Sequence, residues 1–189
     1  MAEVRGILIN AEKAFVKITF GQDAVEKVTA TLPAEEIALI KKRSLDASFY
    51  PYETTVALRH LIRALSMENP KGVATLAEDS GAFFADHIFN GVYKAFVAND
   101  APSMVAKIPW VKDYFFRDFE RVEATMTGDA SCTLMYQFEP GHRQARSACK
   151  SLGAFWARAL EIAGGKRVSV THPTCVRDGA NRCDFLLSW

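Results

Sequence analysis

The stretch RVEATMTGDASCTLMYQF, residues 121–138, decides the fold class of this chain. Apolar side chains occupy every second position on both sides of a Thr-Gly-Asp-Ala turn: Val122, Ala124, Met126, Cys132, Leu134, Tyr136 and Phe138. A period of two residues interrupted by a turn is typical of a β-hairpin with one buried face. We therefore expect antiparallel strands near 121–128 and 131–139.

The residues that follow predict a long helix and a second hairpin. Apolar residues recur at helical spacing between about Arg143 and Ala163, and Gly164-Gly165 ends the run. Alternation then resumes, which predicts strands near 166–175 and 182–189. Two hairpins with a helix between them make a four-stranded antiparallel sheet that is covered on one face.

The residues before Arg121 have helical periodicity instead. Breaks at Gly21 and Pro33 predict several short helices, and apolar stripes continue to about Phe119, so we expect this half to be almost wholly helical. The predicted fold class is α+β, with an N-terminal helical layer packed on a C-terminal four-stranded antiparallel sheet. No repeat or linker divides the chain, so we expect one domain over residues 1–189.

Composition excludes several classes of protein. Hydrophobic residues make up 49% and charged residues 24%, as in ordinary globular proteins. Lys+Arg (23) and Asp+Glu (22) nearly cancel, which disfavours a nucleic-acid partner. The first residues do not have the pattern of a signal peptide, and no apolar run reaches the roughly 18 residues of a membrane span. We expect a soluble, cytoplasmic protein.

Three stretches resemble a myxobacterial paralogous family of unknown function: FYPYETTVALRHLIRAL (49–65), CKSLGAFWARALEIAGGKRVSVTHPTC (149–175) and CVRDGANRCDFLLSW (175–189). The most specific part is Cys-x7-Cys-[DE]-Phe ahead of a C-terminal Trp. That family shares its architecture with the 4-vinyl-reductase domain, the haem–nitric-oxide/oxygen (H-NOX) sensors and the TRAPP trafficking subunits. The resemblance covers nearly the whole chain and implies a helical layer over an antiparallel sheet, often enclosing an apolar pocket.

The resemblance does not fix a function, because relatives of this architecture bind haem, sense small molecules or assemble into trafficking complexes. The H-NOX sensors carry a Tyr-x-Ser-x-Arg clamp for the haem propionates, and this sequence has no such triplet. We therefore expect no H-NOX-type haem and no other cofactor.

The cysteines allow three interpretations: packed thiols, a metal or redox pair, or a contact to a ligand. Cys175 and Cys183 are equidistant from Gly179, so a three-residue loop would set them opposite each other, with Cβ atoms about 4.5–5.5 Å apart. Further metal ligands would have to come from Cys132, Cys149 and His172, and their spacing differs from the close pairs of structural zinc sites. Thiols stay reduced in the cytosol. The favoured interpretation is packed, reduced thiols without a metal.

Catalytic motifs are absent: the sequence has no Gly-x-Gly-x-x-Gly, P-loop, Gly-x-Ser-x-Gly or His-Glu-x-x-His. We therefore expect no enzyme. The aromatic residues either fill a core or line an apolar pocket between helices and sheet. For the pocket we predict six ligand-binding residues, with His87 as the one polar contact: Phe84, His87, Ile88, Tyr136, Phe155 and Trp156.

The first functional hypothesis is a non-enzymatic sensory or regulatory domain that binds a small, largely apolar ligand. The alternative is a dimeric interaction module of TRAPP-like type without a ligand, and a cofactor-dependent reductase comes third because no acid, base or cofactor motif supports it. We also expect a homodimer, since Phe is abundant and net charge is near zero, and a possible signalling partner. An enclosed cavity on the order of several hundred cubic ångströms would favour the first hypothesis.

Overall fold

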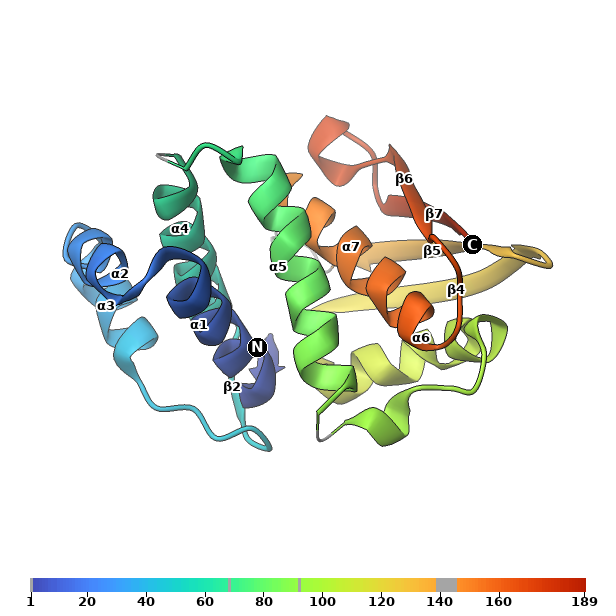
Figure 1. Cartoon of the computed structure of the whole chain (residues 1–189), viewed down its shortest axis with the longest axis horizontal. Coiled ribbons are helices and arrows are strands. Elements are labelled where there is room, and N and C mark those ends of the chain that lie inside the picture. Colours follow the sequence, from blue (N-terminus) through green and yellow to red (C-terminus); the bar gives the residue numbers. More distant parts are fainter. Residues whose placement is uncertain (1, 68, 92, 139–145) are drawn as a thin grey trace.

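The computed structural model of the chain describes residues 2–67, 69–91, 93–138 and 146–189, with the side chain of residue 146 left aside. Helices α1–α4 form one side of the molecule, and a four-stranded sheet forms the other (Figure 1). Helix α5 packs against both α1 and α7, and α7 lies along the sheet (Figure 1). None of the described helices combines the length and the apolar composition needed to cross a membrane.

The N-terminal half is mainly helical, as its periodicity predicts. Gly21, at φ +78°, separates the first two helices, and Asp100 caps the last by accepting a hydrogen bond from the Ser103 amide at 2.7 Å. The helices are α1 (Gly6–Phe20), α2 (Gln22–Thr29), α3 (Ala34–Lys41), α4 (Glu53–Met67), α5 (Gly72–Phe89), η1 (Lys94–Phe96) and α6 (Ala101–Phe115).

The C-terminal half has the predicted order of hairpin, helix and hairpin. Its elements are β4 (Glu120–Gly128), β5 (Ser131–Phe138), α7 (Arg146–Ile162), β6 (Ser169–Thr174), η2 (Val176–Asp178) and β7 (Cys183–Ser188). The strands pair antiparallel in the order β4-β5-β7-β6, and Tyr136 of β5 lies opposite Cys183 of β7. The predicted α+β class and the four predicted strands are confirmed. Residues 143–145 of the predicted helix lie outside the described residues.

A second, smaller sheet corrects the expectation of an almost wholly helical first half. Strands β1 (Glu3–Arg5), β2 (Phe49–Pro51) and β3 (Phe116–Arg117) pair antiparallel in the order β2-β1-β3. Val4, which is fully buried, lies between Tyr50 and Phe116. Each strand has at most three residues, which is too few to show an alternating pattern. The small sheet is therefore visible only in the structure, where residues far apart in the sequence pair.

Helix α7 is held closely on two sides. A Cβ atom at Gly81 of α5 would lie 2.0 Å from the carbonyl oxygen of Ser151, so the backbones of α5 and α7 touch where these helices cross. On the sheet side, a Cβ at Gly153 would lie 3.1 Å from Val170 and 3.5 Å from Phe185. This packing fixes α7 between the helical layer and the sheet and gives it two chemically different sides.

Candidate functional site

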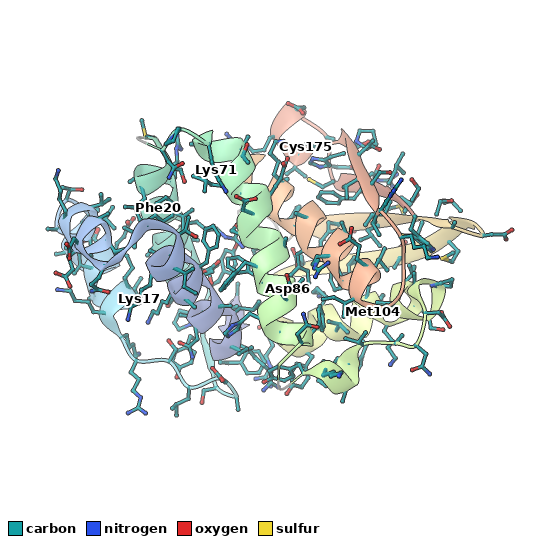
Figure 2. All side chains as sticks on the ribbon, viewed as in Figure 1. Lys17, Phe20, Lys71, Asp86, Met104 and Cys175 are labelled. Carbon is teal, nitrogen blue, oxygen red and sulfur yellow. The ribbon has the colours of Figure 1, made fainter. Side chains whose placement is uncertain are left out.

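Four potential metal ligands meet on the sheet side of α7. Cys149 lies in α7 and His172 in β6. Cys175 is the residue before η2, and Cys183 begins β7. Their ligand atoms all lie within 4.8 Å of one another; the Cys149 and Cys183 sulfurs are 4.0 Å apart and those of Cys183 and Cys175 are 3.9 Å apart. Figure 2 labels Cys175 in the C-terminal segment beside α7. We call these four residues the thiol cluster.

The turn between β6 and β7 builds most of the cluster. After Cys175 the chain makes the 3-10 turn η2, and Gly179 at φ +93° closes it in the left-handed region. The amides of Val176 and Arg177 point at sulfur: Val176 N–H donates to Cys183 at 3.5 Å and Arg177 N–H donates to Cys175 at 3.4 Å. Such amide donors stabilise thiolates, the form in which sulfur binds a metal.

The electrostatics of the cluster separate it from an ordinary buried cysteine. A hydrogen bond with Cys149 and the Val176 amide lower the pKa of the Cys183 thiol to about 5. The same contact with Cys183, together with burial, raises the pKa of Cys149. Cys132, which is outside the cluster, has its pKa raised to about 11 by burial alone. The cluster can therefore present a thiolate near neutral pH, whereas Cys132 is a packed thiol.

His172 supplies the fourth side of the cluster. Its ring stacks on Phe185 with centroids 4.3 Å apart and planes 3° apart, and its buried Nε2 accepts or donates no hydrogen bond among the described residues. An imidazole nitrogen left in this way is suited to a metal. Tetrahedral bonds of about 2.3 Å from zinc place neighbouring sulfurs about 3.8 Å apart, close to the spacing found here.

The sequence interpretation of packed thiols did not anticipate this arrangement, because it judged that the spacing of Cys132, Cys149 and His172 differs from that of structural zinc sites. The signal was present in His172-x2-Cys175, which is a close pair of ligands within the spacing of structural zinc sites. Within the described ranges, no other set of three or more His, Cys, Asp and Glu residues lies close enough to hold a metal.

The opposite side of α7 faces an interior cavity of about 60 Å³. A smaller cavity of about 30 Å³ adjoins it, and five residues line both: Glu12, Arg59, Phe84, Ala148 and Ser151. The wall of the larger cavity is mostly apolar and comes chiefly from α1, α4, α6, α7 and β5. We call the two together the interior cavity.

Several buried polar groups converge on this cavity. Glu12 is 3% exposed, and its Oε1 lies 3.6 Å from Nε of Arg59, which donates through Nη1 to the Tyr52 hydroxyl at 2.7 Å. Burial raises the pKa of Glu12 to about 8, although Arg59 opposes the shift. Burial also raises the pKa of Glu120 to about 8, against Lys112 and Arg59. Perturbed acids at an apolar cavity are a mark of binding sites.

Four of the six predicted pocket residues line the larger cavity: Phe84, Tyr136, Phe155 and Trp156. Ile88 is fully buried in the core but does not line it. His87 corrects the prediction: its side chain is exposed and stacks on Phe83, with ring centroids 5.9 Å apart. Phe84 and Ile88, four residues apart, share the inward face of α5, and His87 falls beyond its edge.

The charged lining of the cavity was missed because charged residues are normally read as solvated. Glu12 nevertheless follows Leu8 and precedes Val16 by four residues each, so it lies within an apolar stripe of α1. A single acid inside such a stripe was the available signal. Arg59 gives no comparable sign, since it is one third exposed and its contact with Glu12 depends on how α1 and α4 pack.

No protein-family model matches the chain, and no curated protein matches it. Its fold is similar to that of solved H-NOX proteins. The S. oneidensis H-NOX protein in the Fe(II)NO ligation state aligns with a TM-score of 0.72 and 14% identity, over 97% of this chain and 98% of that one. The Fe(II) unliganded H-NOX protein from K. algicida aligns with a TM-score of 0.70 and 15% identity, over 97% and 95%. The TM-scores show a common fold, and at these low identities the similarity shows the fold alone.

Haem does not fit the interior cavity. Drug-sized ligands occupy pockets of about 300–1,000 Å³, and the interior cavities measure about 60 and 30 Å³. No histidine is among the described residues that line them, and the sequence lacks the Tyr-x-Ser-x-Arg triplet. The similarity to H-NOX proteins therefore does not place haem in the interior cavity.

Proposed function

We propose that the chain is a one-domain, non-enzymatic sensory or regulatory module that binds a small, largely apolar molecule in the interior cavity. The observation that carries this proposal is a partly open, mostly apolar-walled cavity on which Glu12, Arg59 and Glu120 converge. Its volume of about 60 Å³ is far below the size, on the order of several hundred cubic ångströms, that was expected to favour this function, so the proposal is restricted to a ligand with only a few non-hydrogen atoms.

Xenon is a suitable first probe, because apolar cavities take it up without needing a specific contact. We expect xenon to shift the NMR signals of residues around Phe84 in the wild-type protein, and Phe84→Trp to abolish the shift while the fold remains. Phe83→Trp is the matched control, since Phe83 neighbours Phe84 but lines neither cavity. No xenon response in the wild type, with Phe84→Trp destabilising by about 1–3 kcal/mol through overpacking, would show a filled core instead.

A second candidate function is a zinc centre held by Cys149, His172, Cys175 and Cys183, and it replaces the expectation that the chain has no metal. The proximity of the four ligand atoms, within 4.8 Å, favours it. Bound zinc would join α7 to both strands of the terminal hairpin and supply folding free energy directly.

The test of the zinc centre is elemental analysis of protein purified without chelators. We expect about one equivalent of zinc, lost in Cys183→Ser and retained in Cys132→Ser, because Cys132 is buried outside the cluster. Cobalt substitution should give the absorption of tetrahedral thiolate coordination. Metal-free protein from zinc-supplemented cultures would overturn the proposal.

The adaptor alternative, the homodimer and a signalling partner stay predictions. The large apolar side chains that are exposed belong to different elements rather than to one helical face: Ile18, Leu45, Met67, Trp110, Met126 and Leu186. Light scattering decides the oligomeric state, since a monomer has a mass of 20.9 kDa.

A further inference from the structure

We propose that the ligand of the interior cavity is a short-chain aliphatic alcohol, whose hydroxyl binds Glu12 and Thr55 while its chain occupies the apolar part of the cavity. This inference rests on the proposed ligand-binding function and adds the chemical class of the ligand and the two residues that select it.

Two buried polar atoms at the cavity lack partners. Glu12 Oε2 and Thr55 Oγ1 are both buried and have no hydrogen-bond partner in the described part of the chain, and both residues line the larger cavity. An unsatisfied buried polar group costs about 1–3 kcal/mol, so native structures rarely keep one without a reason. A guest that bonds both atoms would recover this cost.

The helices bring these two groups to the same place. Thr55 precedes Arg59 by one helical turn on α4, so the two side chains share a face. Arg59 contacts Glu12 of α1 at 3.6 Å. Leu8, one turn before Glu12, lines the same cavity and continues its wall with apolar surface. The polar pair therefore lies on the part of the wall that α1 and α4 contribute.

The charges around the cavity favour a neutral guest. Arg59 and Lys112 line it with two positive charges, and Glu12 and Glu120 line it with two acids. A cation would meet Arg59 and Lys112, and an anion would meet Glu12 and Glu120 wherever these acids are ionised, in a medium of low dielectric. A neutral hydroxyl avoids this repulsion.

A hydroxyl also suits Glu12 in both protonation states. It donates to a carboxylate and accepts from a protonated carboxyl, and burial, which raises the pKa of Glu12 to about 8, makes both forms accessible near neutral pH. An ether or ketone can only accept, and an ammonium can only donate.

The small volume of the cavity favours a short aliphatic chain. The space consists of two small lobes of about 60 and 30 Å³ that share Glu12 as a lining residue. The larger lobe is walled by Phe84, Leu152 and Phe155. A narrow aliphatic chain fits there with its hydroxyl at the junction.

The test compares n-butanol with n-butyl chloride, which has nearly the same shape but no hydroxyl, by ligand-detected NMR on the full chain. We expect n-butanol to bind about tenfold more tightly, the value of one net hydrogen bond. Glu12→Leu should remove the preference and leave n-butyl chloride bound, whereas Glu12→Gln, which still donates and accepts, should keep it.

A second pair of variants avoids dependence on the folding of Glu12→Leu. Thr55→Val should reduce the preference for n-butanol. Thr29→Val should leave it unchanged, because Thr29 Oγ1 is equally buried and without a partner among the described residues but lines neither cavity. Equal affinity of the two probes in a wild-type protein that takes up xenon would overturn the alcohol inference alone. Failure to take up xenon, n-butanol or n-butyl chloride would overturn the ligand-binding function itself.

Discussion

The buried polar groups on the two sides of helix α7 differ in their surroundings. On the sheet side, the sulfur of Cys183 lies 4.0 Å from that of Cys149 and 3.9 Å from that of Cys175, and backbone amides donate to Cys183 and Cys175. On the side of the helical layer, Ala148 and Ser151 border a cavity in which Glu12 and Thr55 each leave an atom without a partner in the described chain.

This contrast indicates two kinds of incompleteness. The thiol cluster has its ligands gathered at the spacing of a tetrahedral site, so a single cation would complete it. The cavity has two polar atoms without a partner among the described residues, so a neutral hydrogen-bonding molecule would complete it. The residues that define the thiol cluster do not line the larger cavity, although a Coulombic interaction with Cys183 is among the causes that raise the pKa of Glu120 there.

The largest expected effect is on the thiol cluster. Cys183→Ser should lower the free energy of unfolding by about 3–5 kcal/mol, because zinc binding contributes to folding directly. A strong zinc chelator should destabilise the wild type and leave Cys183→Ser unaffected. Cys132→Ser, which also places a hydroxyl in the core, should cost only about 1–3 kcal/mol and keep its response to the chelator. Equal losses in the two variants, measured by chemical denaturation, would indicate plain packed thiols.

The second effect is the pH dependence of the cavity side. Folding raises the pKa of Glu12 from an ordinary 4.5 to about 8, so the folded protein holds this proton more tightly than the unfolded chain does. The contribution of Glu12 to stability is therefore complete below pH 4.5 and is lost as pH rises through 8. Between pH 5 and 8, the stability of wild type relative to Glu12→Gln should fall by about 2–4 kcal/mol.

The comparison with Glu12→Gln is needed because the stability contributed by the two sides of α7 changes with pH in opposite directions. Zinc displaces protons from thiols, so the cluster becomes more stabilising as pH rises. Subtracting the variant's curve cancels that contribution. A flat difference between pH 5 and 8 would mean that Glu12 is ionised and paired throughout.

The two sides also differed in how far the sequence could predict them. The alternation over 121–138 predicted the sheet because a half-buried strand needs a period of two along its whole length. The inward positions Leu134 and Tyr136 followed from it and are buried. Predicting the thiol cluster would have required the geometry of the turn that joins β6 to β7. That turn brings His172 of β6 and Cys183 of β7 close together.

The cavity side was harder to predict, because its polar residues belong to separate helices. The contact between Glu12 and Arg59 depends on the packing of α1 against α4, which periodicity does not specify. His87 shows the opposite error, since a residue beside an inward stripe was predicted to face inward and is exposed. The periodicity of a single helix locates its buried face only to within roughly one residue. An error of this size explains why His87 was predicted to face inward.

A third prediction concerns the position of α7 between its two sides. Gly81→Ala should destabilise the protein by about 1–3 kcal/mol, because the new Cβ would lie 2.0 Å from a backbone carbonyl of α7 that cannot move alone. Gly153→Ala should cost less, since its nearest neighbour at 3.1 Å is the flexible end of a Val170 side chain. Thermal melts of both variants measure this difference, and the reverse order would show that α7 yields more easily toward α5 than toward the sheet.

The smallest expected effect comes from the hydrogen bond that joins the cavity wall to the sheet. Trp156 Nε1 donates to the Tyr136 hydroxyl, and Tyr136 lies opposite Cys183 in the strand register, so this bond lies between the two sides. Trp156→Phe should cost about 0.5–1.5 kcal/mol for the lost bond, plus a term for the space that the smaller ring leaves. Because that space opens into the cavity, xenon uptake should rise, while zinc content should stay unchanged because Tyr136 is not a ligand. A loss of zinc in this variant, measured by elemental analysis, would show that the two sides of α7 are coupled rather than independent.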